Sequence, residues 1–97
     1  MILDNEYLRY NFNSLNRGTE NHPELDLRYK QIVSIQINAF NEIGDLKSLN
    51  LSNNQLSTLE NTIFNGLGSL KILNVSNNQL SKLDKEIFNG LKCLEYL

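Results

Sequence analysis

The sequence predicts an α/β repeat solenoid, in which short parallel strands stack on one face and loops or short helical turns form the other. Two observations indicate this fold. A segment of 24 residues recurs without gaps, and each copy keeps its apolar residues at the same positions. Within each copy, apolar and polar residues alternate over one short stretch, which is typical of a strand with one buried face. A fixed period of this length indicates stacked units that share a continuous core.

The repeat is clearest in the second half of the chain. Residues 46–69 read LKSLNLSNNQLSTLENTIFNGLGS, and residues 70–93 read LKILNVSNNQLSKLDKEIFNGLKC. Residues 22–45 keep the same apolar frame, and residues 94–97 begin a further unit in phase. An amphipathic helical bundle is the alternative, but Asn-Asn and Asn-Gly pairs recur at fixed phase and would break each helix at the same point. We therefore predict three units and a partial fourth over residues 22–97.

Three sets of positions have predicted structural roles. Residues 49–51 and 73–75 alternate and are expected to form strands with their leucines inward. Asn54 and Asn78 follow these strands and are expected to hydrogen-bond backbone groups of neighbouring turns. The first unit has Lys30 in this column, and so lacks the expected amide. Phenylalanines one period apart are expected to stack as a spine on the wider side of the solenoid: Phe40, Phe64 and Phe88.

The pattern LxxLxLxxNxLxxLxxxxFxxL resembles the leucine-rich-repeat family over residues 22–97. A period of 24 with a late phenylalanine is similar to the "typical" subclass found in Toll-type receptor ectodomains, insect leucine-rich immune proteins and adhesion proteins. The resemblance implies a horseshoe segment with its strands on the concave face. It also implies a non-enzymatic module that recognises a protein, or a glycan, in innate immunity, adhesion or signalling, outside the cell or on its surface.

Outward-facing strand residues are the predicted contact surface, because solenoids bind partners along their concave side. Aromatic residues and arginine are enriched among residues that dominate binding energy, which favours Arg28, Tyr29 and Tyr96. Glu24 and Asp26 would set the local charge. The alternative is that these are ordinary solvated strand positions. The full predicted surface comprises Glu24, Asp26, Arg28, Tyr29, Ser48, Asn50, Ser52, Asn53, Ile72, Asn74, Ser76, Asn77 and Tyr96.

Asn50-Leu51-Ser52 and Asn74-Val75-Ser76 match the acceptor pattern for N-glycosylation. The alternative is that the repeat itself calls for these residue types at this place. Glycans on Asn50 and Asn74 would push partner binding away from the same strands. Glycosylation and binding at these strands are therefore competing predictions.

Composition and motifs favour no catalytic, metal or cofactor site. Nine basic and eleven acidic residues give a net charge of −2, so there is no basic patch to attract nucleic acid. We find no nucleophile–His–acid set, phosphate loop or metal-ligand spacing, and no apolar run approaches the ~18 residues of a membrane span. Cys93 is the only cysteine, which excludes an internal disulfide. We expect no enzyme activity, no metal and no cofactor.

Residues 1–21 have two interpretations. They form either a degenerate repeat unit, with Ile2, Tyr7, Phe12 and Leu15 at its first, sixth, eleventh and fourteenth positions, or an irregular lead. The first residues lack the basic start and apolar run of a secretory signal. The sequence stops at Leu97, inside an expected strand, with no polar capping unit after it.

We therefore expect the chain to be a fragment of a longer protein that carries flanking repeats or caps. Its full-length form is predicted to be extracellular or at the cell surface. The alternative is an intracellular leucine-rich-repeat scaffold, which the missing signal and lone cysteine fit and which would bind a protein through the same strip.

Overall fold

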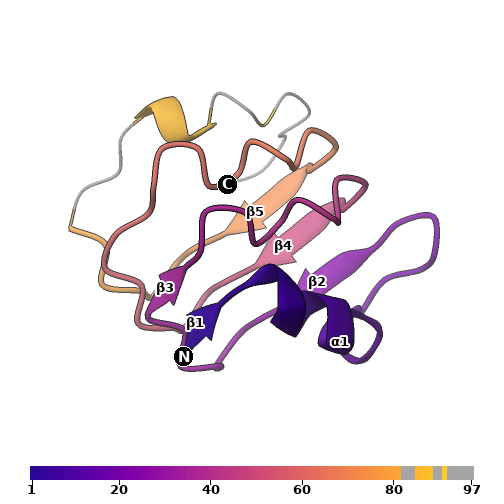
Figure 1. The fold of residues 1–97 in the computed structure, drawn as a ribbon, viewed down its shortest axis with the longest axis horizontal. Coiled ribbons are helices and arrows are strands. Elements are labelled where there is room, and N and C mark those ends of the chain that lie inside the picture. Colours follow the sequence, from indigo (N-terminus) through magenta and orange to yellow (C-terminus); the bar gives the residue numbers. More distant parts are fainter. Residues whose placement is uncertain (82–84, 89–90, 92–97) are drawn as a thin grey trace.

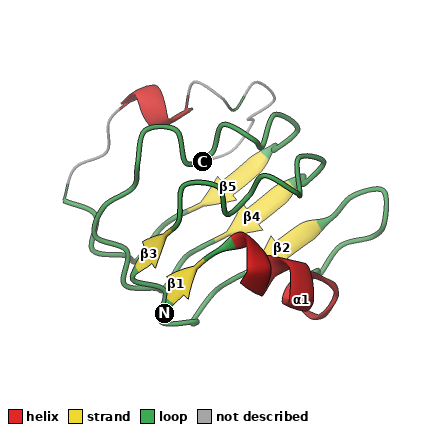
Figure 2. Ribbon diagram, in the orientation of Figure 1, coloured by secondary structure: helices red, strands yellow, loops and turns green. Residues whose placement is uncertain are grey.

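A computed structural model describes residues 1–81, 85–88 and 91. Its main sheet consists of β2 (Glu24–Asp26), β4 (Ser48–Asn50) and β5 (Ile72–Asn74), in the order β2-β4-β5. The strands are parallel, and each residue pairs with the one 24 positions later in the next strand (Figure 1). Loops carry the chain from the end of each strand back to the start of the next (Figure 2). This register confirms the predicted 24-residue period and the parallel strands.

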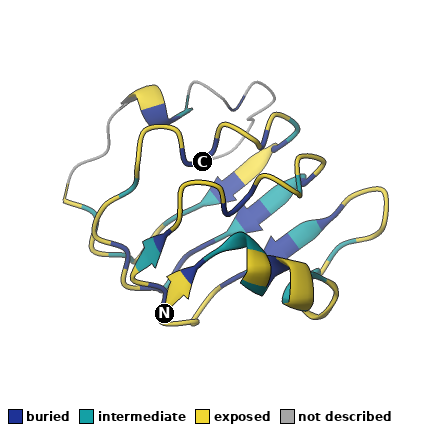
Figure 3. Cartoon of the chain, in the orientation of Figure 1, coloured by how far each residue is buried: buried dark blue, intermediate teal, exposed yellow. Residues whose placement is uncertain are grey.

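The core lies on one side of this sheet, where the leucines of successive units stack. Leu25, Leu49 and Leu73 occupy equivalent positions in the three strands and are at most 1% exposed. The neighbouring strand positions are half-buried or exposed (Figure 3). The strands begin one residue earlier than the alternation at residues 49–51 and 73–75 suggested. Leu51 is nevertheless fully buried, so the predicted inward face is confirmed in the second unit.

Residues 1–21 form neither a degenerate unit in the expected register nor an irregular lead. They contain β1 (Ile2–Leu3) and an eleven-residue helix, α1 (Asn5–Leu15). β1 pairs in parallel with β3 (Ser34–Ile35) and places Leu3 opposite Ile35, whereas the sequence alignment had put Leu15 in that column. The helix begins where Asp4 accepts a hydrogen bond from the Tyr7 amide at 2.8 Å, an N-cap that the spacing of apolar residues did not reveal.

The segment after α1 borders the outer edge of β2. Asn16 forms an antiparallel bridge with Leu25, and its side-chain oxygen accepts a hydrogen bond from the Glu24 amide at 2.9 Å. The Arg17 amide donates to the Glu24 carbonyl at 2.7 Å. These bonds satisfy the Glu24 backbone at an edge where unpaired amides would otherwise face solvent. Helix α1 lies beside β2 on the side away from β4 (Figures 1 and 2).

Asn54 joins the first two units through five backbone groups. Its side-chain nitrogen donates to the carbonyls of Leu27 and Leu51, both at 2.9 Å, and to that of Ser52 at 3.2 Å. Its oxygen accepts from the amides of Lys30 at 3.0 Å and Ile32 at 3.1 Å. The side chain therefore ties its own turn to the turn of the preceding unit, as the sequence predicted.

Asn78 repeats this arrangement one unit later. It donates to the carbonyls of Leu51 and Val75 at 3.0 Å and accepts from the Leu56 amide at 3.0 Å. Each asparagine thus reaches back into the preceding unit.

This explains why Lys30 can break the column. Asn54 accepts from amides 24 and 22 residues earlier. The amides at the same separations from Lys30 belong to Glu6 and Leu8, which lie in helix α1 and present no such turn.

On the opposite side of the core, part of the predicted phenylalanine spine is present. Phe40 and Phe64 are buried, and their rings stack with centroids 6.0 Å apart and planes 23° from parallel. Phe88 lies at the end of the short 3-10 helix η1 (Lys85–Phe88), where it packs partly buried against the core. The described structure contains no ring stack between Phe88 and Phe64, so only the first step of the spine is present there.

Asn54→Ala is expected to lower the free energy of unfolding by about 3 kcal/mol, because it leaves several buried backbone groups without partners. Asn54→Asp should also destabilise, since a carboxylate cannot donate to the carbonyls. Urea denaturation followed by circular dichroism measures both. Asn61→Ala, at an exposed asparagine, is the control and should change stability by less than about 0.5 kcal/mol. Equal effects at the two asparagines would contradict the bridging role.

Candidate functional site

The outward side chains of the main sheet form two rows across the strands. Glu24, Ser48 and Ile72 make one row, and Asp26, Asn50 and Asn74 make the other. We call these six residues the strand face. Because the buried leucines beneath hold the strands in register, the side chains of each row are spaced by roughly 4.8 Å.

The second row ends each strand with the same side-chain turn. Asn50 accepts hydrogen bonds through its side-chain oxygen from the Ser52 amide at 3.0 Å and the Ser52 hydroxyl at 2.7 Å. Asn74 accepts from the Ser76 amide and hydroxyl at the same distances. An asparagine that bonds its own backbone two residues on is a stable way to turn out of a strand. The Asn-x-Ser pattern therefore has a structural role in this repeat.

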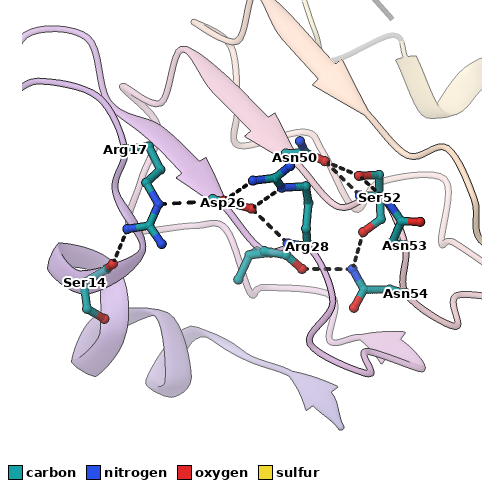
Figure 4. A network of polar contacts seen from close by, with 9 residues as sticks. Ser14, Arg17, Asp26, Arg28, Asn50, Ser52, Asn53 and Asn54 are labelled. Carbon is teal, nitrogen blue, oxygen red and sulfur yellow. Dashed lines mark hydrogen bonds and ion pairs between the residues drawn. The ribbon is translucent and has the colours of Figure 1, made fainter.

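The first unit keeps this turn but changes its chemistry. Asp26 takes the asparagine position and accepts from the Arg28 amide at 3.1 Å. The Arg28 guanidinium adds a two-point contact, with Nε and Nη2 each 2.9 Å from a different carboxylate oxygen (Figure 4). Arg17 approaches from the loop after α1, with its Nε 3.8 Å from Asp26. The hydrogen bond from Arg28 lowers the pKa of the Asp26 carboxyl and raises that of the guanidinium.

The residue after each turn has a left-handed backbone. Tyr29, Asn53 and Asn77 have φ angles of 56°, 58° and 55°. Asparagine adopts this conformation readily, whereas a tyrosine there is strained. Tyr29 is 73% exposed, so burial of its ring does not explain its presence. Strain at an exposed position is more often associated with function than with folding.

The structure places the sequence-predicted contact residues as follows. Arg28 and Tyr29 are exposed beside the half-buried Glu24 and Asp26. Ser52 differs from the expectation of a solvent-facing position: it is 3% exposed and its hydroxyl donates to Asn50, whereas Ser76 makes the same bond to Asn74 and is exposed. Tyr96 lies outside the described residues. The others are exposed or half-buried near the strand ends: Ser48, Asn50, Asn53, Ile72, Asn74, Ser76 and Asn77.

Two residues of this region were missed in the sequence. Arg17 and Lys30 line a hollow of about 210 Å³ together with Asp26, Arg28 and Tyr29. In the sequence, Lys30 stands out only because it replaces the asparagine of the other units. Arg17 reaches Asp26 only because of the path of the loop between them, and the spacing of residues in the sequence does not predict that path. We call these five residues the first-unit corner.

A larger cavity lies elsewhere, between α1 and the first repeat. It has a volume of about 610 Å³, an apolar wall that includes Leu8 and Phe12, and a rim where Arg9 and Glu42 form an ion pair at 3.0 Å. The carboxylates of Glu20 and Asp45 also line it. Serine, cysteine and histidine are absent from its described lining, and Thr19 supplies a hydroxyl there.

Within the described part of the chain, no three His, Cys, Asp or Glu side chains gather as a metal site would require. Every buried side-chain nitrogen or oxygen found there has a hydrogen-bond partner. None of the helices in the same ranges is both long enough and apolar enough to cross a membrane. The described surface offers a sheet face whose polar side chains are held by hydrogen bonds at the strand ends, a geometry suited to contacting another molecule.

Tyr29→Asn is expected to raise the free energy of unfolding by about 1 kcal/mol, because asparagine tolerates the left-handed backbone found at this position in the other units. Denaturant unfolding of the purified chain measures the change. The control is Tyr10→Asn, which makes the same replacement at an exposed helical tyrosine and should not stabilise. A loss of stability in Tyr29→Asn would mean that the ring supports the fold.

Comparison with known proteins agrees with this architecture. The family model described as "Leucine rich repeat" matches residues 23–80 and 44–97. Together these matches span the three units and the residues after them. A search of curated proteins finds no matching sequence. The matching ranges, the 24-residue register of the strands and the bridging asparagines lead to one conclusion: the chain belongs to the leucine-rich-repeat family.

Proposed function

We propose that this chain is a non-enzymatic recognition module that binds a partner protein through its strand face. Leucine-rich-repeat domains generally mediate protein–protein interaction, and they are typically binding modules without catalytic activity. The observation that carries the proposal is the contrast between two sets of positions. The buried columns keep the same residue types from unit to unit, whereas the strand-face row of Glu24, Ser48 and Ile72 does not.

This contrast is sharpest in the row that runs from Glu24 through Ser48 to Ile72. The three positions share one backbone register, yet they carry an acid, a hydroxyl and an exposed apolar side chain. Packing between units does not require any of these residue types, because the core contacts come from Leu25, Leu49 and Leu73. A surface that varies on a constant scaffold is what specific recognition needs.

We also propose that the module belongs to an extracellular or cell-surface protein of innate immunity, adhesion or signalling. Support comes from the period of 24 residues with a late phenylalanine, which resembles the typical subclass. Flanking repeats would extend the sheet on the side of β5. The alternative is an intracellular scaffold that uses the same strand face for a cytoplasmic partner.

Glycosylation of Asn50 and Asn74 stays a candidate modification under this proposal. Both side chains are half-buried at the strand face, and their oxygens are engaged by Ser52 and Ser76. A glycan on either would cover the surface proposed to bind the partner. We favour an unmodified strand face, because the hydrogen bonds within each turn already explain the Asn-x-Ser pattern.

Ile72→Arg should weaken partner binding about tenfold or more, because it places a long charged side chain in the strand face. Ile37→Arg is the matched control: it makes the same change at an exposed isoleucine outside this surface. Wild-type and variant chains would be titrated, by biolayer interferometry, against proteins that bind the wild type saturably. Circular dichroism checks that both variants fold. Partners that bind both variants equally, or that are lost only with Ile37→Arg, would contradict the assignment of the strand face.

The proposed location predicts that a membrane-impermeant biotin reagent labels the natural protein on intact cells, or that the protein is found in the medium. A cytosolic marker protein is the internal control and must stay unlabelled. Detection only after the cells are permeabilised would favour the intracellular scaffold. Treatment of the labelled fraction with an N-glycosidase then reports whether Asn50 and Asn74 carry glycans, as a size shift that Asn50→Gln with Asn74→Gln abolishes.

A further inference from the structure

The first-unit corner differs in its side chains from the equivalent places in the next units although the strand register and the turn hydrogen bond are kept, while Gln31 adds a left-handed residue that Gln55 and Gln79 do not share. Asp26, Arg28, Tyr29 and Lys30 stand where the second unit has Asn50, Ser52, Asn53 and Asn54. The turn hydrogen bond is kept, since the Asp26 oxygen accepts from the Arg28 amide as the Asn50 oxygen accepts from the Ser52 amide. The left-handed residue is kept as well. The fold therefore does not demand these four side chains.

The replacements gather positive charge around one carboxylate. Arg17, Arg28 and Lys30 line the hollow with Asp26 as its single acid, although the chain as a whole has a net charge of −2. Glu24 lines the adjoining hollow together with Arg17 and Arg28, so three cations face two carboxylates over the wider surface. The corner is thus locally cationic on a weakly acidic protein.

The pairing with Asp26 leaves the positive charges of this corner accessible to another molecule. Its carboxylate is only 17% exposed and is occupied by Arg28 and, at 3.8 Å, by Arg17. The two guanidiniums remain 49% and 64% exposed. The Lys30 ammonium has no ion-pair partner among the described residues and is exposed. Figure 4 shows both arginines converging on Asp26, Arg28 from the turn after β2 and Arg17 from the loop after α1.

Tyr29 supplies an apolar wall beside these cations. Its ring is 73% exposed and is presented by a strained backbone that asparagine would relax. Arginine with an adjacent exposed tyrosine is a combination enriched in protein recognition sites. Guanidinium groups in particular bind carboxylates by paired hydrogen bonds.

We propose that the first-unit corner binds an acidic segment of the partner protein, with Arg28, Lys30 and Arg17 contacting its Asp or Glu carboxylates and Tyr29 packing against the segment. This inference rests on the proposed protein-binding function and names the chemistry of the partner. We propose an acidic segment because its negative charge would complement the three cationic side chains that line the hollow. The rest of the strand face, being uncharged at Ser48, Asn50, Ile72 and Asn74, would contact other parts of the same partner.

The test uses the full chain and a synthetic oligoglutamate peptide, with oligoglutamine of the same length as the neutral control. Amide shifts followed by NMR in about 0.1 M salt should change saturably at Arg17 and at residues 28–30 with oligoglutamate only. Arg28→Ser and Lys30→Asn introduce the residue types of the other units and should each weaken binding about tenfold. Tyr29→Asn should weaken it about threefold while the chain stays folded.

Matched controls separate the corner from overall charge. Arg9→Ser removes an exposed arginine that also pairs with a carboxylate, and Lys71→Asn removes an exposed lysine elsewhere. Both should leave the oligoglutamate affinity within about twofold of wild type, because long-range charge effects are screened over roughly 10 Å at moderate salt. Equal losses with corner and control variants would overturn the proposal, since binding would then reflect net charge alone.

Further outcomes, with other ligands and with partner proteins, also test the proposal. Binding of a sulfated heparin fragment at the corner without binding of oligoglutamate would overturn the proposal in favour of a glycan ligand. Partner proteins that are lost with Ile72→Arg but retained with Arg28→Ser and Lys30→Asn would overturn the acidic partner and leave the proposed function standing. Partners that Ile72→Arg does not affect would instead contradict the proposed function itself. Loss of both oligoglutamate and partner protein in the corner variants is the result we expect.

Discussion

Register between units is the constraint on which this structure depends, and Asn54 shows how it is maintained. A single buried side chain satisfies carbonyls and amides of two successive turns, so neither unit can shift without leaving buried groups unpaired. The leucine rows then repeat from strand to strand, and Phe40 stacks on Phe64 on the opposite side of the core. Because the inner face of the sheet is held in this way, the outer face can change its residues without loss of order.

Because the inner face maintains the fold, a residue at the end of a strand can keep the turn and still change the outer surface. Asp26 serves the same turn as Asn50 while adding a carboxylate that holds Arg28. One position can thus meet a structural requirement and alter the surface at once. The backbone strain lies at Tyr29, whose left-handed conformation is more favourable for an asparagine. A binding role for this unit accounts for a residue that the fold alone would not favour.

The sequence predicted the parts of the fold that depend on periodicity. The units, the inward leucines, the parallel register and the bridging asparagines follow from a spacing of 24 residues. Helix α1 was not predicted, because Asp4 caps a segment whose apolar residues also fit a repeat alignment. In the candidate site, Arg28 and Tyr29 were identified by residue type, whereas Arg17 depends on a loop path that spacing does not encode. The burial of Ser52 was not predicted, because strand alternation does not describe the turn that follows β4.

The claim that fold and surface are separable can be tested by one measurement on the first unit. Asp26→Asn, Arg28→Ser, Tyr29→Asn and Lys30→Asn, combined in one chain, give this unit the side chains of the second. The free energy of unfolding of this chain, from denaturant titration, is predicted to equal or exceed that of wild type. A loss of several kcal/mol would contradict the account, because it would show that these side chains are required for the fold.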